Sequence, residues 1–231
     1  MRAVLFDLDG TLLDIDLDAF LPVYFGALGP VIANLTGSTP SAAIRAVMDS
    51  TNAMMLPHPG TTNRQTFDAR FIELTGVDLE HEDGLITEFY TKVFPTLGSG
   101  LGPTDGARRA VQTAIDAGLL VTVATNPIFP AAAVSERIRW AGLGDIAFSL
   151  VTTYEIMHAC KPDPAYFHET ALMLGVDTSE CLMVGDDAML DMGAAKAGMA
   201  TFFVGATGGE TADYRGNLNE LAELLPTFGI C

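Results

Sequence analysis

Short, continuous apolar runs recur along the chain, separated by stretches with helical periodicity. The runs are rich in Val, Leu and Ala and do not alternate with polar residues, which is typical of strands buried on both faces of a parallel sheet. They cover Ala3–Phe6, Leu119–Ala124, Ile146–Val151, Cys181–Val184 and Ala200–Val204. The pattern predicts five strands of one parallel sheet.

Helical stretches separate the later strands, and a glycine suited to a helix C-cap follows each of them closely. They cover Asp105–Ala117, Pro130–Trp140, Pro164–Leu174 and Asp191–Ala197. Strands that alternate with helices in this way predict an α/β fold, a doubly wound parallel sheet of the Rossmann-like type.

Residues 14–97, called the cap segment below, interrupt this alternation and show no strand pattern. Helical periodicity appears around Leu17–Ala33, Ser41–Met54, Thr66–Leu74 and Gly84–Val93. We expect an all-helical cap domain over residues 14–97, inserted into an α/β core domain of residues 1–13 and 98–231. The glycine-rich run 98–103 predicts a flexible hinge at the exit of the cap segment.

The charge of the chain excludes some classes of partner. The 231 residues include 29 acidic and 12 basic side chains, which gives a net charge of −17, while 49% of residues are apolar. A surface of that sign disfavours binding to nucleic acid or to anionic membranes. Any phosphate-bearing ligand meets a repulsive average field, so its site needs a metal ion or a lysine.

The cysteines and the apolar runs indicate the compartment. Cys160, Cys181 and Cys231 are far apart and form no C-x-x-C pair, so we expect reduced thiols. The first apolar run is too short for a signal peptide, and no run reaches the roughly 20 apolar residues of a membrane helix. We therefore expect a cytoplasmic protein, either a monomer or a homodimer.

Polar residues gather where the predicted strands end, and ligands of open parallel sheets bind at the carboxyl ends of the strands. Because Asp7 and Asp9 are two residues apart, an extended backbone would point both side chains to one side. With Asp186 they offer hard oxygen ligands for Mg²⁺. Mg²⁺ together with Lys161 would reverse the local negative field and hold a phosphate, to which Thr125 could donate a hydrogen bond.

Four motifs in the same order resemble those of the haloacid dehalogenase-like hydrolase superfamily, in its phosphatase-type branch. They are Asp7-Leu8-Asp9-Gly10-Thr11, Thr125-Asn126, Lys161-Pro162-Asp163-Pro164, and Gly185-Asp186 with Asp191 and the run Gly193-Ala194-Ala195 after it. The resemblance spans the chain, with the cap segment in the place of the helical cap of that family.

The resemblance implies a role for each motif residue. Asp7 would attack phosphorus and form an aspartyl-phosphate, and Asp9 would protonate the leaving oxygen and then activate water. Mg²⁺ would bind the Asp7 carboxylate, the Asp9 backbone carbonyl and Asp186. The second aspartate favours phosphate esters, because the dehalogenases of the family lack it.

The remaining motif residues would support these groups. Thr125 would bind the phosphoryl group, with Asn126 holding that loop, and Lys161 would neutralise charge on the nucleophile and the phosphoryl group. Asp187 and Asp191 would hold metal-bound water or orient Lys161, and Thr11 would fix the turn after the first strand. The predicted function is Mg²⁺-dependent hydrolysis of a small phosphorylated metabolite.

Other functions use similar residues. A phosphomutase of the same superfamily would return the phosphoryl group to a sugar, and a phosphonate hydrolase would need a cap lysine, for which Lys92 is the candidate. Outside the enzymes, a receiver-like signalling domain or a phosphate-ligand-binding protein without turnover also gathers such groups. A receiver is about half this size, and intact Asp7, Asp9, Lys161 and Asp186 argue against a silent binder.

The substrate beyond the phosphate is not specified by the motifs. The candidates in the cap segment for polar residues that face the site are Arg45, Asn52, His58, Asn63 and Arg64. An arginine facing inward would favour a second anionic group on the substrate, and a plain surface position is the alternative for each.

Overall fold

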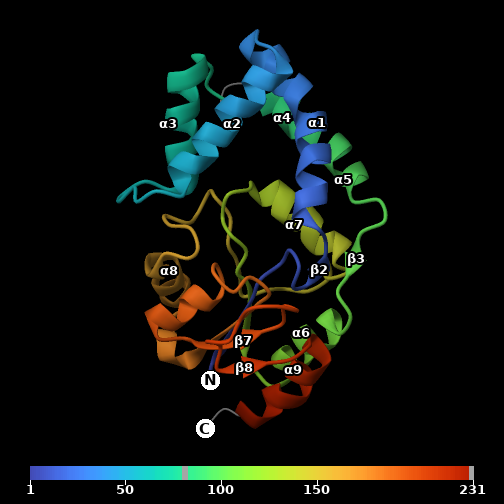
Figure 1. Ribbon diagram of the computed structural model, residues 1–231, viewed down its shortest axis with the longest axis vertical. Coiled ribbons are helices and arrows are strands. Elements are labelled where there is room, and N and C mark those ends of the chain that lie inside the picture. Colours follow the sequence, from blue (N-terminus) through green and yellow to red (C-terminus); the bar gives the residue numbers. More distant parts are fainter. Residues whose placement is uncertain (80–82, 229–231) are drawn as a thin grey trace.

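The computed structural model describes residues 1–79 and 83–228. These residues fold around one parallel sheet (Figure 1). Six strands pair in the order β5-β4-β1-β6-β7-β8, and every pair is parallel. They are Ala3–Phe6 (β1), Leu120–Val123 (β4), Leu150–Val151 (β5), Cys181–Gly185 (β6), Ala200–Phe203 (β7) and Tyr214–Arg215 (β8). The predicted α/β fold with a parallel, Rossmann-like sheet is confirmed.

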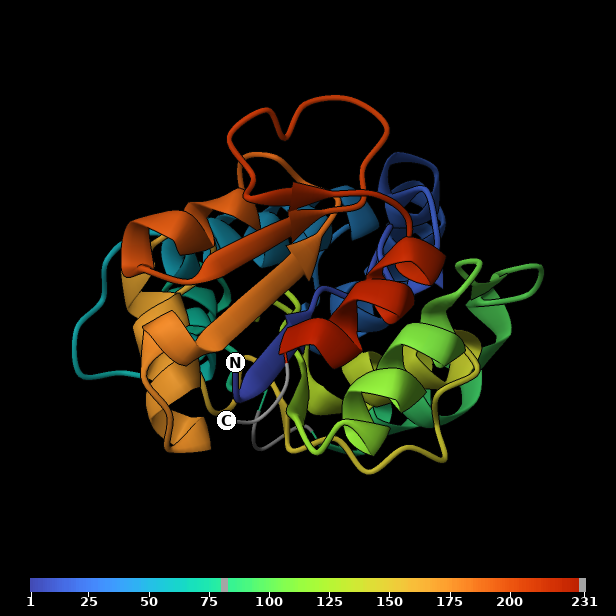
Figure 2. The ribbon, with the colours of Figure 1, turned by 90° about the horizontal axis from the view of Figure 1, so that it is seen from below.

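The two faces of the sheet bury alternate residues of the same strands. Val4 and Phe6 of β1 pack into one core with the helices Ala107–Asp116 (α6), Ala131–Trp140 (α7) and Leu218–Leu224 (α9). Ala3 and Leu5 pack into a second core with Pro164–Leu174 (α8) and the 3-10 helix Met192–Ala197 (η3). Figure 2 shows these helices on opposite sides of the strands. Burial on both faces explains the continuous apolar runs in the sequence.

Several predicted elements differ in extent or type. The run Ile146–Val151 contributes only its last two residues to β5, and Asp191–Ala197 forms the 3-10 helix η3 in place of an α-helix. Strand β8 was not predicted, because two exposed residues give no apolar run. Short 3-10 helices also cover Thr178–Glu180 (η2) and Leu225–Phe228 (η4).

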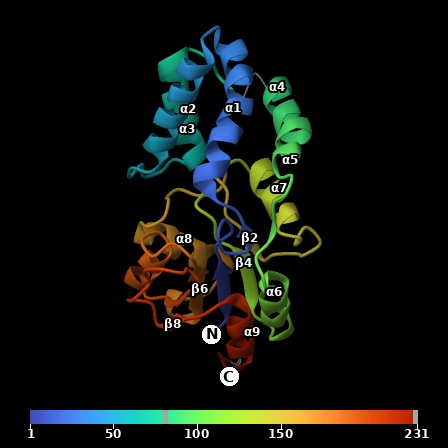
Figure 3. The ribbon, with the colours of Figure 1, turned by 45° about the vertical axis from the view of Figure 1, so that its right-hand side comes forward.

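The cap segment is helical, and its helices lie beyond the carboxyl ends of the strands (Figure 3). They are Leu17–Thr36 (α1), Pro40–Met54 (α2), Asn63–Thr75 (α3), Asp83–Glu88 (α4), the π-helix Phe89–Val93 (η1) and Phe94–Leu97 (α5). Helix α3 begins earlier than predicted, because Thr62 and Gln65 form a capping box. The division into a core domain and a cap domain remains a prediction.

The chain entering the cap segment pairs with the chain leaving it. Leu13–Asp14 (β2) and Gly102–Pro103 (β3) form an antiparallel ribbon, and the Thr104 N–H donates to the Leu12 carbonyl at 3.0 Å. The predicted hinge over residues 98–103 therefore includes hydrogen-bonded backbone at its end.

Helix α1 is the one helix of the described residues that is long and apolar enough, by length and composition alone, to cross a membrane. We expected no segment long and apolar enough to cross a membrane, and by the criterion of length and composition alone this expectation is wrong. Phe20, Tyr24, Leu28 and Ile32 of this helix are buried within the fold. A helix that packs in a protein core passes the same test, so the finding is weak evidence of a membrane span. The expectation of free thiols is confirmed for Cys160 and Cys181, whereas Cys231 lies outside the described residues.

Candidate active site

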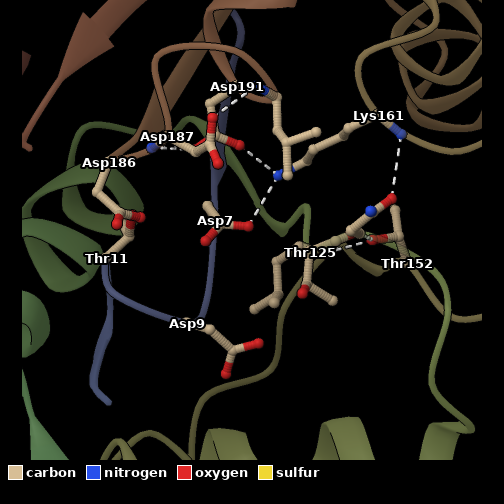
Figure 4. Close-up of polar contacts among 12 residues, drawn as sticks. Asp7, Asp9, Thr11, Thr125, Thr152, Lys161, Asp186, Asp187 and Asp191 are labelled. Atoms are coloured by element: carbon tan, nitrogen blue, oxygen red, sulfur yellow. Dashed lines mark hydrogen bonds and ion pairs between the residues drawn. The ribbon is translucent and has the colours of Figure 1, made fainter. Parts of the chain in front are cut away.

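The turn after β1 places Asp7, Asp9 and Thr11 at the edge of the sheet (Figure 4). The Asp7 N–H donates to the Val184 carbonyl at 2.8 Å, which fixes the first aspartate beside β6. Gly10 has a φ of +81°, and a Cβ there would overlap the Asp186 carboxylate, so the close approach of these two strand ends requires glycine. The Thr11 hydroxyl donates to Asp186 Oδ1 at 2.9 Å and orients that carboxylate.

Lys161 joins two of the aspartates in the interior of the protein. Its ammonium donates to Asp7 Oδ1 at 2.8 Å and to Asp191 Oδ1 at 2.6 Å, and its side chain is 1% exposed. Burial by itself would lower the pKa of Lys161, but Asp191 and Asp7 raise the pKa above its usual value. The ammonium is therefore charged. The Lys161 N–H also donates to Asn126 Oδ1 at 3.1 Å, which ties this loop to the end of β4.

Thr125 is held through its backbone. Its carbonyl accepts hydrogen bonds from the Thr152 hydroxyl at 2.7 Å and from the Tyr166 hydroxyl at 3.0 Å. These two supporting hydroxyls were not predicted, because neither Thr152 nor Tyr166 is a residue of the four motifs. They fix the loop at a position where Thr125 lines the same pocket as Asp7.

The carboxylates at this edge suit a hard divalent cation. Ligand oxygens of Asp7, Asp186 and Asp191 lie within 4.8 Å of one another. Burial is the main cause that raises the pKa of both Asp7 and Asp186 above the usual range, and the charge of Asp191 adds to the rise. The charge of Lys161 opposes the rise at Asp7, and the hydrogen bond from Thr11 opposes it at Asp186. A bound cation would relieve the desolvation and the repulsion, so these residues fit Mg²⁺.

The supporting aspartates have different partners. Asp191 uses one oxygen for Lys161 and the other to accept the Asp187 N–H at 3.0 Å, so both of its oxygens are engaged. Asp7 and Asp186 each keep one oxygen without a hydrogen bond among the described residues. Asp187 accepts the N–H groups of Met189 and Leu190 at 2.7 and 2.8 Å and organises the turn after β6.

Asp9 pairs with an arginine that sequence reasoning missed. Arg137 Nη1 of α7 contacts Asp9 Oδ2 in an ion pair whose side chains are 1% and 8% exposed. The Arg137 guanidinium also lies 4.3 Å from the centroid of the Phe129 ring. Burial raises the pKa of Asp9, and the charges of Arg137 and Lys161 oppose that rise. Figure 4 shows the Asp9 carboxylate apart from the Lys161 network, on the side toward α7.

A signal for Arg137 exists in the sequence. The residue falls on the helix face that carries Ala133, Val134 and Ile138, where the periodicity of an amphipathic helix calls for an apolar side chain. A charged residue on a buried face implies a buried partner of opposite charge.

The catalytic pocket has a volume of about 130 Å³ and brings together most of the predicted residues. Asp7, Asp9, Thr125, Asn126, Lys161, Asp186, Asp187 and Asp191 all line it. Thr11 lies behind it, against Asp186. Two further residues, Leu17 of α1 and Leu190, complete the lining. Leu17 is the only described residue of the cap segment in this pocket.

The polar candidates of the cap segment lie elsewhere. Arg45 is exposed and donates to Ser41 at 3.1 Å, and Arg64 pairs with Asp68 at 3.3 Å. His58 contacts the carbonyls of Met54 and Thr61, whereas Asn63 is buried and donates to the Pro127 carbonyl at 2.9 Å. Asn52 lines a separate cavity. The idea that an arginine of the cap segment faces the catalytic pocket therefore receives no support.

Lys92, the candidate for a phosphonate hydrolase, is also remote from the pocket. It is exposed and pairs with Glu88 at 2.9 Å one helical turn away. Lys92 is therefore a solvent-exposed residue of its helix, as the alternative interpretation expected.

Comparison with known proteins supplies the family. A family model described as haloacid dehalogenase-like hydrolase matches residues 1–198. A phosphoglycolate phosphatase of Xylella fastidiosa (strain Temecula1 / ATCC 700964) is 29% identical over 199 residues, which cover 86% of this chain and 77% of that protein.

Solved structures share the fold at lower identity. The crystal structure of a HAD phosphatase from Thermococcus onnurineus has a TM-score of 0.61 and 24% identity, covering 97% of this chain and 98% of that one. An L-2-haloacid dehalogenase from Xanthobacter autotrophicus with chloropropionic acid covalently bound has a TM-score of 0.58 and 16% identity, with the same coverage. Because the family model matches most of the sequence, this chain belongs to the haloacid dehalogenase-like hydrolases, and the prediction of a hydrolase is confirmed.

Proposed function

We propose that this protein is a Mg²⁺-dependent phosphohydrolase that cleaves a small phosphomonoester through an aspartyl-phosphate on Asp7. One observation carries the proposal: the buried ammonium of Lys161 lies between Asp7 and Asp191, at 2.8 and 2.6 Å, at the floor of a pocket that Thr125 also lines. A fixed cation beside a carboxylate nucleophile lowers the repulsion between that carboxylate and an approaching phosphate dianion. Phosphatase relatives such as the Xylella protein support the same reaction class.

The proposed reaction has two steps on the groups of this chain. A carboxylate oxygen of Asp7 forms a bond to phosphorus while the ester P–O bond breaks, and the leaving oxygen takes a proton from Asp9. Asp9 then removes a proton from water, the water oxygen attacks phosphorus, and the bond to Asp7 breaks to release phosphate. Lys161 and Thr125 hold the phosphoryl oxygens in both steps.

Arg137 fixes the position of the Asp9 carboxylate and influences its pKa in this scheme. Its ion pair fixes Asp9 Oδ2, while burial raises the pKa of Asp9. A raised pKa suits a carboxyl group that must give and take a proton near neutral pH. The charge of Arg137 opposes that rise and favours the ionised carboxylate, which is the form that acts as the base in the second step.

Asp7 and Asp186 would hold Mg²⁺, with the Asp9 backbone carbonyl as a further ligand. When bound, the ion supplies positive charge to the phosphoryl oxygens. Thr11 orients Asp186 for this purpose through its 2.9 Å hydrogen bond. Among the described residues, the cap segment adds only Leu17 to the catalytic pocket. No observation therefore favours the sugar contacts that a phosphomutase requires.

The test is release of inorganic phosphate from a panel of phosphomonoesters, with Mg²⁺ and with EDTA. Asp7→Asn is expected to lower kcat by roughly 10³-fold or more, since it removes the nucleophile. Asp14→Asn, an exposed carboxylate seven residues further on, is the matched control and should retain the rate. Full activity of Asp7→Asn, or equal activity in EDTA, would contradict the proposed mechanism.

A further inference from the structure

A second, larger cavity lies between the cap segment and the core. Its volume is about 270 Å³, and α1, α2 and the loop after β4 contribute most of its walls. The lining includes Leu21, Leu28, Val47, Ile86, Ile128 and Phe129. Of the described residues around it, none carries a charge. The hydroxyls of Tyr24 and Tyr90, which also line it, hydrogen-bond to each other at 2.8 Å. Thr51 and Asn52 are the other polar side chains of the described lining, and the remaining lining residues are apolar or aromatic, so the cavity offers a largely apolar environment.

This cavity adjoins the catalytic pocket. Leu17 lines both spaces. The loop after β4 borders the catalytic pocket at Asn126 and the cavity at Ile128, and the Ile128 N–H donates to the Asn126 carbonyl at 2.8 Å. Phe129 borders the cavity on one side and contacts Arg137, the partner of Asp9, on the other. The apolar space thus begins on the Asp9 side of the catalytic pocket.

We infer that this cavity receives the apolar body of the leaving group, so that the substrates are phosphomonoesters of apolar alcohols. The inference rests on the proposed function, in which Asp9 protonates the leaving oxygen and the leaving group lies on the Asp9 side. A dry apolar cavity of about 150 Å³ holds benzene, so 270 Å³ accommodates roughly ten carbon atoms. A small hydroxy acid would place its carboxylate toward uncharged walls, where burial of a charge is costly.

The experiment compares n-alkyl phosphates from ethyl to decyl, with phosphoglycolate as the small polar comparison, in buffer with Mg²⁺. We expect kcat/KM to rise about three- to four-fold per methylene up to roughly eight to ten carbons, the ratio that corresponds to about 0.8 kcal/mol per buried methylene. Equal kcat/KM for ethyl and octyl phosphate, or a higher value for phosphoglycolate than for octyl phosphate, overturns the inference and leaves the proposed function standing.

Variants of the cavity lining distinguish an effect on the preference for long alkyl chains from a general loss of activity. Val47→Phe fills part of the cavity and should lower the octyl-to-ethyl ratio of kcat/KM at least ten-fold. Met48→Trp, at a half-exposed lining position that tolerates bulk, should lower the same ratio if Val47→Phe does not fold. Val23→Phe, on the exposed side of α1 and outside the lining, is the matched control and should leave the ratio unchanged. An unchanged ratio in both folded cavity variants contradicts the inference.

A binding measurement distinguishes failure of the inference from failure of the proposed function. Octylphosphonate and ethylphosphonate carry the same head group and are not phosphate esters. If no phosphomonoester is hydrolysed but octylphosphonate binds at least 100-fold more tightly than ethylphosphonate, the cavity assignment stands and the proposed function is wrong. If the two phosphonates bind equally, the cavity assignment is wrong whatever the turnover.

Discussion

Removal of the Arg137 guanidinium, for example by Arg137→Met, is expected to destabilise the protein strongly at neutral pH. The variant leaves Asp9, whose side chain is 8% exposed, without its partner of opposite charge. Loss of one member of a buried ion pair costs about 3–5 kcal/mol, and little of this is screened by solvent here. That is a large part of the roughly 5–15 kcal/mol that stabilises a typical domain.

The destabilisation should depend on pH in a defined direction. Burial raises the pKa of Asp9 from 3.8, and Arg137 opposes the rise, so the variant has a still higher pKa at this carboxyl. A raised pKa in the folded state means that the folded protein binds the proton more tightly, and that stability falls as the pH rises through the folded pKa. The deficit of Arg137→Met is therefore largest at neutral pH and shrinks on acidification.

Urea denaturation in EDTA at pH 7.5 and pH 5 measures this deficit. Arg139→Met is the matched control on the same helix, since Arg139 is 63% exposed in its pair with Glu136 and its loss should change the stability little. Adding Asp9→Asn to Arg137→Met should restore much of the stability, because the buried charge is then gone. If Arg137→Met behaves like Arg139→Met at pH 7.5, or if its deficit does not shrink at pH 5, the reasoning about the buried pair is refuted.

The proposed site makes further predictions. Lys161→Met should lower kcat by about 10²–10³-fold, as loss of one charged donor to a transition state does, and steady-state phosphate release measures the effect; a loss below ten-fold would speak against its role. Mg²⁺ at 100 times its Kd should add about 2.7 kcal/mol to the free energy of unfolding, and Asp186→Asn should abolish this gain, as thermal unfolding with and without the ion can show. Thr11→Val should weaken Mg²⁺ binding about 10- to 100-fold in calorimetry while Asp186 remains present; unchanged affinity would mean that the 2.9 Å hydrogen bond does not orient the ligand.

The residues at the strand ends were predictable because the signal is local. Each buried strand is a continuous apolar run, and in a parallel sheet all the carboxyl ends meet at one edge. Asp7, Thr125, Lys161 and Asp186 therefore line one pocket, as the order of the motifs predicted.

Other features depend on packing between distant segments. The partnership of Asp9 and Arg137 requires α7 to present one face beneath the turn after β1, and periodicity alone does not give the orientation of that helix. The apolar cavity likewise arises where two cap helices and the loop after β4 fail to fill the space between them. Strand β8 forms on two exposed residues that pair with β7, so its cause is tertiary pairing and not a local apolar pattern.

The cap segment is joined to the rest of the protein at more than one place. Both crossings between the cap segment and the rest of the chain run through the paired ribbon of β2 and β3. The N-terminus of α3 is attached at a second place, where the Asn63 and Arg64 N–H groups donate to the carbonyls of Met157 and Tyr154 at 2.7 and 2.8 Å. We therefore expect that any rotation of the cap segment about the ribbon would require these two backbone hydrogen bonds to break.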